Sequence, residues 1–268
     1  MRNYSQVFAV GDIHGCRDLL QNMHKKILES AQNVEGKKLL IYLGDYIDRG
    51  PDIKETIQTL IDFQPENFKR VFLLGNHEQM LLEFISGSKN SPYIWLGNGG
   101  LETFKSYGID LSKYIDDSTM ELYHDKKIRK QLLESIPSSH KDFFNQLQLS
   151  YEWDNYFFVH AGIDPNLPLD QQDKEDMLWT RSKNFFDPMM TYHKIIVHGH
   201  TPVDKIEEFP CRINLDTGAV FSNKLSCLYF NSGKMNLLST YSVKIIIILC
   251  NTLYLILLSH YCLAHYTG

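Results

Sequence analysis

The sequence contains no run of three or more consecutive lysine or arginine residues, and its 268 residues carry a formal net charge of −5. Proteins that bind nucleic acid through their electrostatic field usually present a basic patch or stripe. The sequence therefore predicts no nucleic-acid partner. A hydrophobic content of 43% with 22% charged residues is typical of a globular protein that buries a full core.

The sequence also lacks a CxxC pair among its five cysteines, and residues 1–6 contain no apolar stretch of the kind found in secretory signals. A secreted domain stabilised by disulfides would carry cysteines at a higher density and in an even number. We therefore expect reduced thiols and a catalytic domain in the cytoplasm.

Short apolar segments recur along the chain, and each ends in a cluster of glycine and polar residues. Runs of four to six apolar residues that are rich in β-branched and aromatic types predict buried strands. The segments are residues 7–10, 39–43, 71–74, 156–159 and 194–197.

Helical spacing of apolar residues separates the first three of these segments. One expected helical face has five members: Leu19, Leu20, Met23, Ile27 and Leu28. A second has four: Ile53, Ile57, Leu60 and Ile61, with Pro51 placed to open the helix. Alternating strands and helices predict an α/β fold with functional loops at the carboxyl ends of the strands. Residues 90–149 break this rhythm, and we expect them to form a helical insert near the site.

Six side chains with oxygen or nitrogen donors follow these strands. They are Asp12, His14, Asp45, Asn76, His160 and His200. A single polar residue in a loop is usually solvated or caps a helix, but a sheet brings the ends of its strands together. Carboxylate, imidazole and amide ligands suit a divalent ion such as Mn²⁺, Fe²⁺ or Zn²⁺.

The number of donors favours two metal ions over one. Six ligands exceed what one ion can bind while it leaves room for a substrate. A carboxylate such as Asp45 can bridge two ions, which lie about 3.5–4 Å apart in sites of this kind. Two cations lower the pKa of water and neutralise phosphate oxygens.

The motifs that hold these donors resemble a known family. The segments GDIHG (11–15), GDYIDRG (44–50), GNHE (75–78), His160 and GHTP (199–202) occur in an order similar to that of the phosphoprotein phosphatases of the calcineurin-like metallophosphoesterase superfamily. Further segments resemble its bacterial and phage branch, typified by the bacteriophage lambda protein phosphatase. They are GNHEQM (75–80), WLGNGG (95–100), LWTR (178–181), HGHTP (198–202) and DTGAVF (216–221). The resemblance covers about residues 7–234.

This resemblance implies a four-layer α/β fold in which two packed mixed sheets are flanked by helices. It implies a metal-dependent phosphomonoesterase that acts on phosphorylated serine or threonine in a protein or peptide. Two divalent ions, Mn²⁺ foremost, would be the cofactors. It further implies that Asp12 and His14 bind the first metal and that Asp45 bridges both. Asn76, His160 and His200 would bind the second metal.

The resemblance also implies the roles of the residues around the metals. His77 would be the general acid that protonates the leaving alkoxide, and Asp48 would hold its imidazole charged and oriented. Arg49 and Arg181 would clamp the phosphate, because a guanidinium matches two phosphate oxygens. Asn76 is expected to contact the substrate as well as metal.

Two alternatives stay open. Symmetrical diadenosine tetraphosphatases share most of these motifs, but they typically have alanine at the position of Asp48 and aspartate at that of Glu78. An Asp–His dyad suits a poor alkoxide leaving group, so both residues favour the phosphatase. The second alternative is a catalytically silent scaffold, which would be expected to have lost a ligand or His77.

Several other residues of these motifs are ambiguous. His198 could contact metal or substrate, but the ligand of its motif is His200. Trp95, with the glycines that follow it, could shape a substrate rim or simply pack beside a turn. Cys16 fits a packed small residue better than a redox switch.

The last 29 residues, 240–268, differ from the rest. Residues 245–258 are almost wholly aliphatic, and an extension through residue 264 gives about 20 residues, enough to cross a bilayer. We therefore divide the chain into a catalytic domain of residues 1–239 and a hydrophobic tail. The tail could be a membrane anchor over residues 245–264, an extra packed element, or a segment without function.

Overall fold

The computed structural model describes residues 3–87, 92–112, 114 and 125–241. Its strands are β1 (Gln6–Val10), β2 (Lys38–Tyr42), β3 (Phe68–Phe72), β4 (Ser150–Trp153), β5 (Tyr156–Val159), β6 (Ile195–His198), β7 (Glu207–Phe209), β8 (Arg212–Asn214), β9 (Lys224–Asn231) and β10 (Lys234–Tyr241). The longer helices are α1 (Arg17–Ala31), α2 (Ile53–Asp62), α3 (Asn76–Ser86), α6 (Asp125–Ser135) and α7 (Ser138–Asn145). The shorter ones are α4 (Pro92–Trp95), η1 (Leu96–Gly100), α5 (Leu101–Ser106), η2 (Leu169–Gln171), α8 (Lys174–Trp179), α9 (Lys183–Phe186) and α10 (Ala219–Ser222).

The strands form two five-stranded mixed sheets. The first has the order β10-β9-β1-β2-β3, and the second has the order β4-β5-β6-β8-β7. In the first sheet, β1 pairs in parallel with β2, and β2 with β3, whereas β9 runs antiparallel to β1. In the second, β5, β6 and β8 are parallel neighbours. The carboxyl ends of the parallel strands therefore lie along one edge of each sheet.

The two sheets pack face to face, as the family resemblance implied. Side chains alternate along β1, so Val7 and Ala9 enter the core between the sheets and Phe8 and Val10 face the helices. From the second sheet, Phe158 reaches the same inner core. Because both faces of β1 and β2 are buried, these strands are continuous apolar runs rather than alternating ones.

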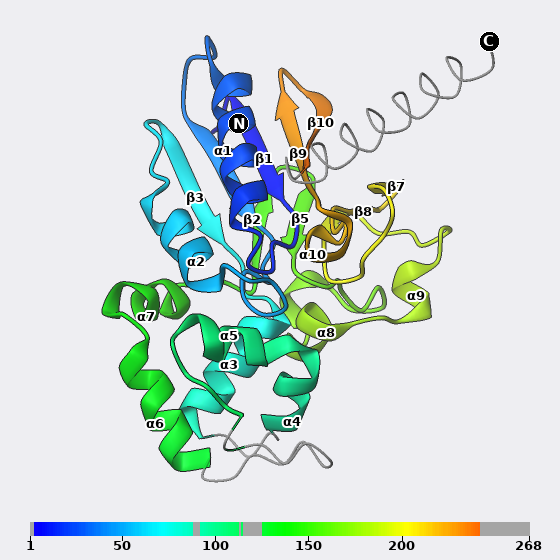
Figure 1. The fold of residues 1–268 in the computed structure, drawn as a ribbon. Coiled ribbons are helices and arrows are strands. Elements are labelled where there is room, and N and C mark those ends of the chain that lie inside the picture. Colours follow the sequence, from blue (N-terminus) through cyan, green and yellow to red (C-terminus); the bar gives the residue numbers. More distant parts are fainter. Residues whose placement is uncertain (1–2, 88–91, 113, 115–124, 242–268) are drawn as a thin grey trace, which may run out of the picture.

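Helices cover both outer faces, which completes the four layers (Figure 1). Helix α1 buries the predicted face except for Leu28, which is 44% exposed. The prediction was wrong there because the other four residues join the core cluster that includes Leu225 and Cys227 of β9, and Leu28 does not. Pro51 also lies outside α2, which begins at Ile53 after the N-cap Asp52.

A group of helices follows β3 and lies at the carboxyl ends of the strands (Figure 1). Helices α3 to α7 belong to it, and Phe84, Trp95 and Phe104 pack against one another inside it. On the other side, Phe185 from α9 packs with Val159 and Ile196 against the outer face of the second sheet. These helices border the region where the predicted ligands gather.

Residues 240 and 241 of the hydrophobic tail complete strand β10, whereas residues 242–268, with the proposed anchor over residues 245–264, lie outside the described residues. Among the helices that the structure does describe, none combines the length and apolarity needed to cross a membrane.

Candidate metal centre

The loops that follow the strands bring all six predicted ligands to one place. The backbone N–H groups of Ile13 and His14 both donate to the carbonyl of Asp45, at 3.1 and 2.9 Å, and so join the loops after β1 and β2. His14, Asp45 and His200 adopt positive φ angles of 45°, 52° and 68°. Such conformations are uncommon for residues other than glycine and persist where surrounding contacts hold them. The backbone is therefore set by the tertiary contacts of the site.

Two groups of buried side chains could each hold a cation. One comprises His14, Asp45 and His77, and the other comprises Asp45, His160 and His200. Asp45 belongs to both: its Oδ2 lies 3.4 Å from Nε2 of His14, and its Oδ1 lies 3.4 Å from Nε2 of His160. One carboxylate thus separates two potential cation positions.

The imidazoles are oriented by backbone carbonyls. Nδ1 of His14 lies 2.8 Å from the carbonyl of Ile47, and Nδ1 of His160 lies 2.9 Å from that of Leu43. A hydrogen bond donated by Nδ1 leaves the lone pair on Nε2, which faces the centre. Burial, reinforced by the neighbouring His77, lowers the pKa of His14 to about 3. A neutral imidazole with a directed lone pair is ready to bind a cation.

His200 completes the second group. Burial and the nearby His160 lower its pKa to about 2. Its Nδ1 lies 3.0 Å from Oδ1 of Asn76, and Nε2 of His160 lies 2.9 Å from the same oxygen. The amide oxygen of Asn76 therefore points between the two imidazoles.

Asp12 belongs to neither group of three, although it is buried beside them. Its Oδ2 accepts a hydrogen bond from the backbone N–H of His200 at 2.9 Å, and its Oδ1 has no partner among the described residues. Burial, with the charges of Asp216 and Asp45, raises the pKa of Asp12 well above its usual range. A buried carboxylate oxygen without a partner is unfavourable unless a proton or a cation satisfies it.

The electrostatics of Asp45 agree with this arrangement. Burial opposes its ionisation, but the surrounding His160, His77 and His14 outweigh burial and lower its pKa. The site thus combines two buried carboxylates, three imidazoles and an amide oxygen, and Oδ1 of Asp12 has no partner among the described residues. This donor set fits a centre of two divalent cations.

Beside the centre lies the predicted dyad. Nδ1 of His77 is 2.6 Å from Oδ2 of Asp48, and both side chains are buried. Two residues of the helical insert (residues 90–149) also donate to Asp48. Nε1 of Trp95 donates to Oδ2 at 2.8 Å, and Oγ1 of Thr103 donates to Oδ1 at 2.5 Å. Nε2 of His77 has no partner among the described residues and lies 3.8 Å from Oδ2 of Asp45. The dyad therefore presents one nitrogen to the centre.

Both predicted arginines reach the site. Nη1 of Arg49 lies 2.8 Å from Nε2 of His14, and its Nε donates to the carbonyl of Asn98 at 3.3 Å. The guanidinium also lies over the ring of Phe221, 5.8 Å from its centroid. Arg181 is exposed, and its Nε lies 3.4 Å from Nε2 of His200. One guanidinium therefore lies beside each of the two groups of potential ligands.

Glu78 has a structural role that the motif did not reveal. Its carboxylate accepts hydrogen bonds from the backbone N–H groups of Asp45, Tyr46, Ile47 and Gly75, at 2.8 to 3.1 Å. Because one of these groups belongs to Asp45, Glu78 fixes the loop that carries the central carboxylate.

The three ambiguous residues have defined surroundings in the structure. His198 does not join the ligands: its Nδ1 contacts the carbonyl of Gly199, and its ring packs against Phe185 and Phe186. Trp95 is buried and contacts the dyad. Cys16 is partly buried, and burial raises the pKa of its thiol to about 12, which suits a packed residue better than a redox switch.

Asp216 was not assigned a role from the sequence. It is buried near Asp12, and its Oδ1 accepts a hydrogen bond from the backbone N–H of Gly218 at 2.8 Å. Burial raises its pKa to about 6. Its sequence signal was the DTGAVF motif (216–221), whereas the strand before it, residues 212–214, is too short and polar to be recognised from the sequence.

Comparison with known proteins places this geometry in context. The model of the calcineurin-like phosphoesterase family matches residues 5–248. An asymmetrical bis(5'-nucleosyl)-tetraphosphatase from Oceanobacillus iheyensis is 29% identical, over 84% of this chain and 88% of that protein. Serine/threonine-protein phosphatase 2 from Salmonella typhimurium is 30% identical, over 83% of this chain and 92% of that protein.

The fold is also found among solved structures. A structure provisionally described as a diadenosine tetraphosphatase superimposes with a TM-score of 0.61 at 22% identity, covering 90% of this chain and 97% of that one. At that identity the similarity shows the shared fold alone.

Proposed function

The chain belongs to the calcineurin-like phosphoesterase family, and we propose that within this family it is a serine/threonine protein phosphatase. The observation that carries the proposal is the dyad, in which Nδ1 of His77 lies 2.6 Å from a buried carboxylate oxygen of Asp48. A serine or threonine alkoxide is a very poor leaving group and departs only when it is protonated. A phosphate leaving group needs no such proton, so a tuned acid in this position favours a phosphomonoester.

We assign the metal ligands as the resemblance implied. Asp12 and His14 would hold the first ion, Asp45 would bridge, and a second ion would be held by Asn76, His160 and His200. Buried donor atoms that face one another support the assignment, and so does the unsatisfied Oδ1 of Asp12. Two bound cations, Mn²⁺ foremost, would supply Lewis acidity that polarises the ester and lowers the pKa of water.

His77 would donate its Nε2 proton to the leaving oxygen. Burial lowers the pKa of this imidazole, but the charges of Asp45 and Asp48 outweigh burial and raise it above its ordinary value. A raised pKa favours the acid form that a proton donor needs. The orientation is favourable because Nδ1 is held by Asp48 while Nε2 has no partner among the described residues.

Arg49 and Arg181 would bind the phosphoryl oxygens. Each guanidinium already lies near a proposed ligand, His14 for Arg49 and His200 for Arg181. A phosphoryl group that lies over the two cation positions would be flanked by both. The amide of Asn76 would help to orient the same group. A guanidinium is suited to this task because its planar fork matches two oxygens of one phosphate.

A second candidate is hydrolysis of a dinucleoside tetraphosphate, which the relative from Oceanobacillus iheyensis supports. Its name specifies asymmetrical cleavage, whereas the sequence had suggested the symmetrical enzymes as the rival. The decisive experiment measures kcat/KM with added Mn²⁺ for a phosphoserine peptide and for diadenosine tetraphosphate. A preference for the peptide supports the phosphatase, and a preference for the dinucleotide overturns it. Inactivity on both, and on p-nitrophenyl phosphate, would favour a silent scaffold.

A further inference from the structure

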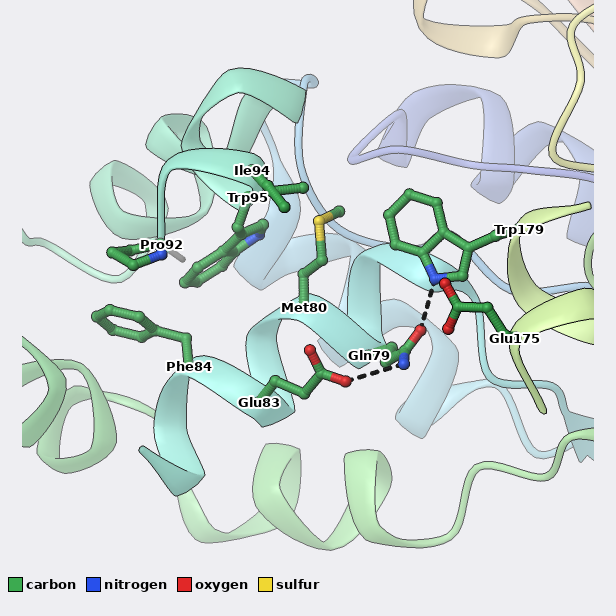
Figure 2. A pocket seen from close by; sticks show the side chains of 9 residues that line it. All are labelled: Gln79, Met80, Glu83, Phe84, Pro92, Ile94, Trp95, Glu175 and Trp179. Carbon is green, nitrogen blue, oxygen red and sulfur yellow. Dashed lines mark hydrogen bonds between the residues drawn. The ribbon is translucent and has the colours of Figure 1, made fainter. Parts of the chain in front are cut away.

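A pocket of about 270 Å³ opens beside the site and is unused by the proposed chemistry. Helix α3 provides Gln79, Met80, Glu83 and Phe84, α4 provides Pro92, Ile94 and Trp95, and α8 provides Glu175 and Trp179 (Figure 2). The pocket thus lies where α3 and α4 meet α8, the helix that precedes Arg181.

Two tryptophans connect the pocket to the site. Trp95 donates from Nε1 to Asp48, and the ring of Trp179 lies edge-on to His200, with 6.2 Å between their centroids. The pocket therefore lies beside both the dyad and the proposed metal ligand His200.

The walls are mainly apolar, but two carboxylates lie among them. Oε1 of Glu83 accepts a hydrogen bond from Nε2 of Gln79 at 2.9 Å, and Oε1 of Gln79 accepts one from Nε1 of Trp179 at 2.7 Å. This chain of hydrogen bonds holds Glu83 and the indole in place (Figure 2). Glu175 is exposed, and its carboxylate has no hydrogen bond or ion pair with another described side chain.

We propose that this pocket binds a basic side chain, foremost arginine, that neighbours the phosphorylated residue of a protein substrate; the proposal rests on the phosphatase activity proposed above. The aliphatic stem of arginine would lie along Met80 and Trp179, and its guanidinium would meet the carboxylates of Glu83 and Glu175. Arginine fits better than lysine because its planar group stacks on an indole and forms a fork with a carboxylate.

A nucleobase fits this pocket less well. The side chain of Met80 lies between the two indoles, so they do not form a slot for a flat ring (Figure 2). The two carboxylates would also repel the polyphosphate chain attached to a nucleobase. Both features favour a cationic occupant.

The test compares phosphoserine peptides that differ only at positions flanking the phosphoserine, with arginine, alanine or glutamate. The enzymes are the unmodified protein, Glu175→Gln and the double variant Glu83→Gln/Glu175→Gln. Glu208→Gln is the matched control, because Glu208 is also an exposed glutamate and lies on β7. Two further substrates are measured in parallel. They are p-nitrophenyl phosphate, which has no flanking residues, and diadenosine tetraphosphate.

We expect kcat/KM for the arginine peptide to exceed that for the alanine peptide by about 3- to 10-fold. This is the usual size of the effect of a partly exposed charge pair with an aromatic contact. Glu175→Gln should lower this preference, and the double variant should abolish it. The Glu208→Gln control should keep it, and all four proteins should hydrolyse p-nitrophenyl phosphate at similar rates.

The outcomes separate the two proposals. Equal rates for the three peptides, or a preference that survives in the double variant, overturn the pocket assignment alone. Hydrolysis of diadenosine tetraphosphate without hydrolysis of any phosphopeptide overturns the phosphatase proposal, and the pocket assignment falls with it.

Discussion

The indole Nε1 of Trp95 donates a 2.8 Å hydrogen bond to Oδ2 of Asp48, the same oxygen that lies 2.6 Å from Nδ1 of His77. Thr103 contacts the other oxygen, so three donors surround one buried carboxylate. Two of these donors, Trp95 and Thr103, come from the helical insert and not from the loops that follow the strands. This segment thereby orients the proposed general acid.

Trp95→Phe removes one of these donors and should destabilise the protein by about 1–3 kcal/mol, the usual effect of removing a partner from a buried polar group. Because Asp48 would then hold His77 less precisely, hydrolysis of a phosphoserine peptide should fall more than that of p-nitrophenyl phosphate. Trp153→Phe is the matched control, since that indole packs on Tyr156 and Phe230 away from the site. Equal losses on both substrates would reduce Trp95 to a packing residue.

His77→Asn tests general acid catalysis, which typically contributes about 10²–10⁴-fold. Serine alkoxide needs the proton and p-nitrophenolate does not, so the loss in kcat/KM should be much larger for the phosphoserine peptide. The raised pKa of His77 also predicts that the peptide activity falls at alkaline pH and that the variant loses this fall. Asp48→Asn should show the same substrate bias, more weakly. A uniform loss would leave His77 as a phosphate-binding residue.

Asp45→Asn should abolish activity, because one carboxylate faces both groups of imidazoles. An amide offers one oxygen without a charge, and both cation positions would be weakened. Metal analysis of the purified variant should give clearly less than two equivalents of Mn²⁺ per chain. Full metal content together with full activity would show that Asp45 is not the bridge.

Arg181→Ala should raise KM and lower kcat/KM for p-nitrophenyl phosphate. The guanidinium would bind the phosphate in both the ground state and the transition state, so its removal weakens binding throughout the reaction. Lys183→Ala removes a neighbouring exposed cation and serves as the control for long-range charge. If the kinetics of Arg181→Ala match those of the control, the guanidinium does not bind the phosphate.

Glu78→Gln should destabilise the loop after β2 by about 1–3 kcal/mol and reduce metal binding, because an amide NH₂ would face backbone N–H donors. Glu83→Gln, on the same helix, makes the same change of charge without contact with that loop. Thermal unfolding and Mn²⁺ titration of both variants check this. A variant of Glu78 with unchanged Mn²⁺ affinity would limit the residue to stability.

The sequence by itself determined the fold class and the location of the site. Apolar runs that end in glycine and a polar donor predict strands whose ends meet, and the ordered motifs indicated the family. Asp12, Asp45 and His160 were therefore brought together as expected. These positions could be predicted because each donor follows, within a few residues in the sequence, the strand that positions it.

Only the tertiary structure decided which residues hold the dyad and which line the pocket. Trp95 and Thr103 lie 47 and 55 residues from Asp48, and no periodic pattern reports a contact over that separation. The exposure of Leu28 and the surroundings of His198 could not be predicted for the same reason. Whether an apolar or imidazole side chain faces a core, a ligand or solvent depends on what packs against its element. That neighbour comes from a distant part of the chain.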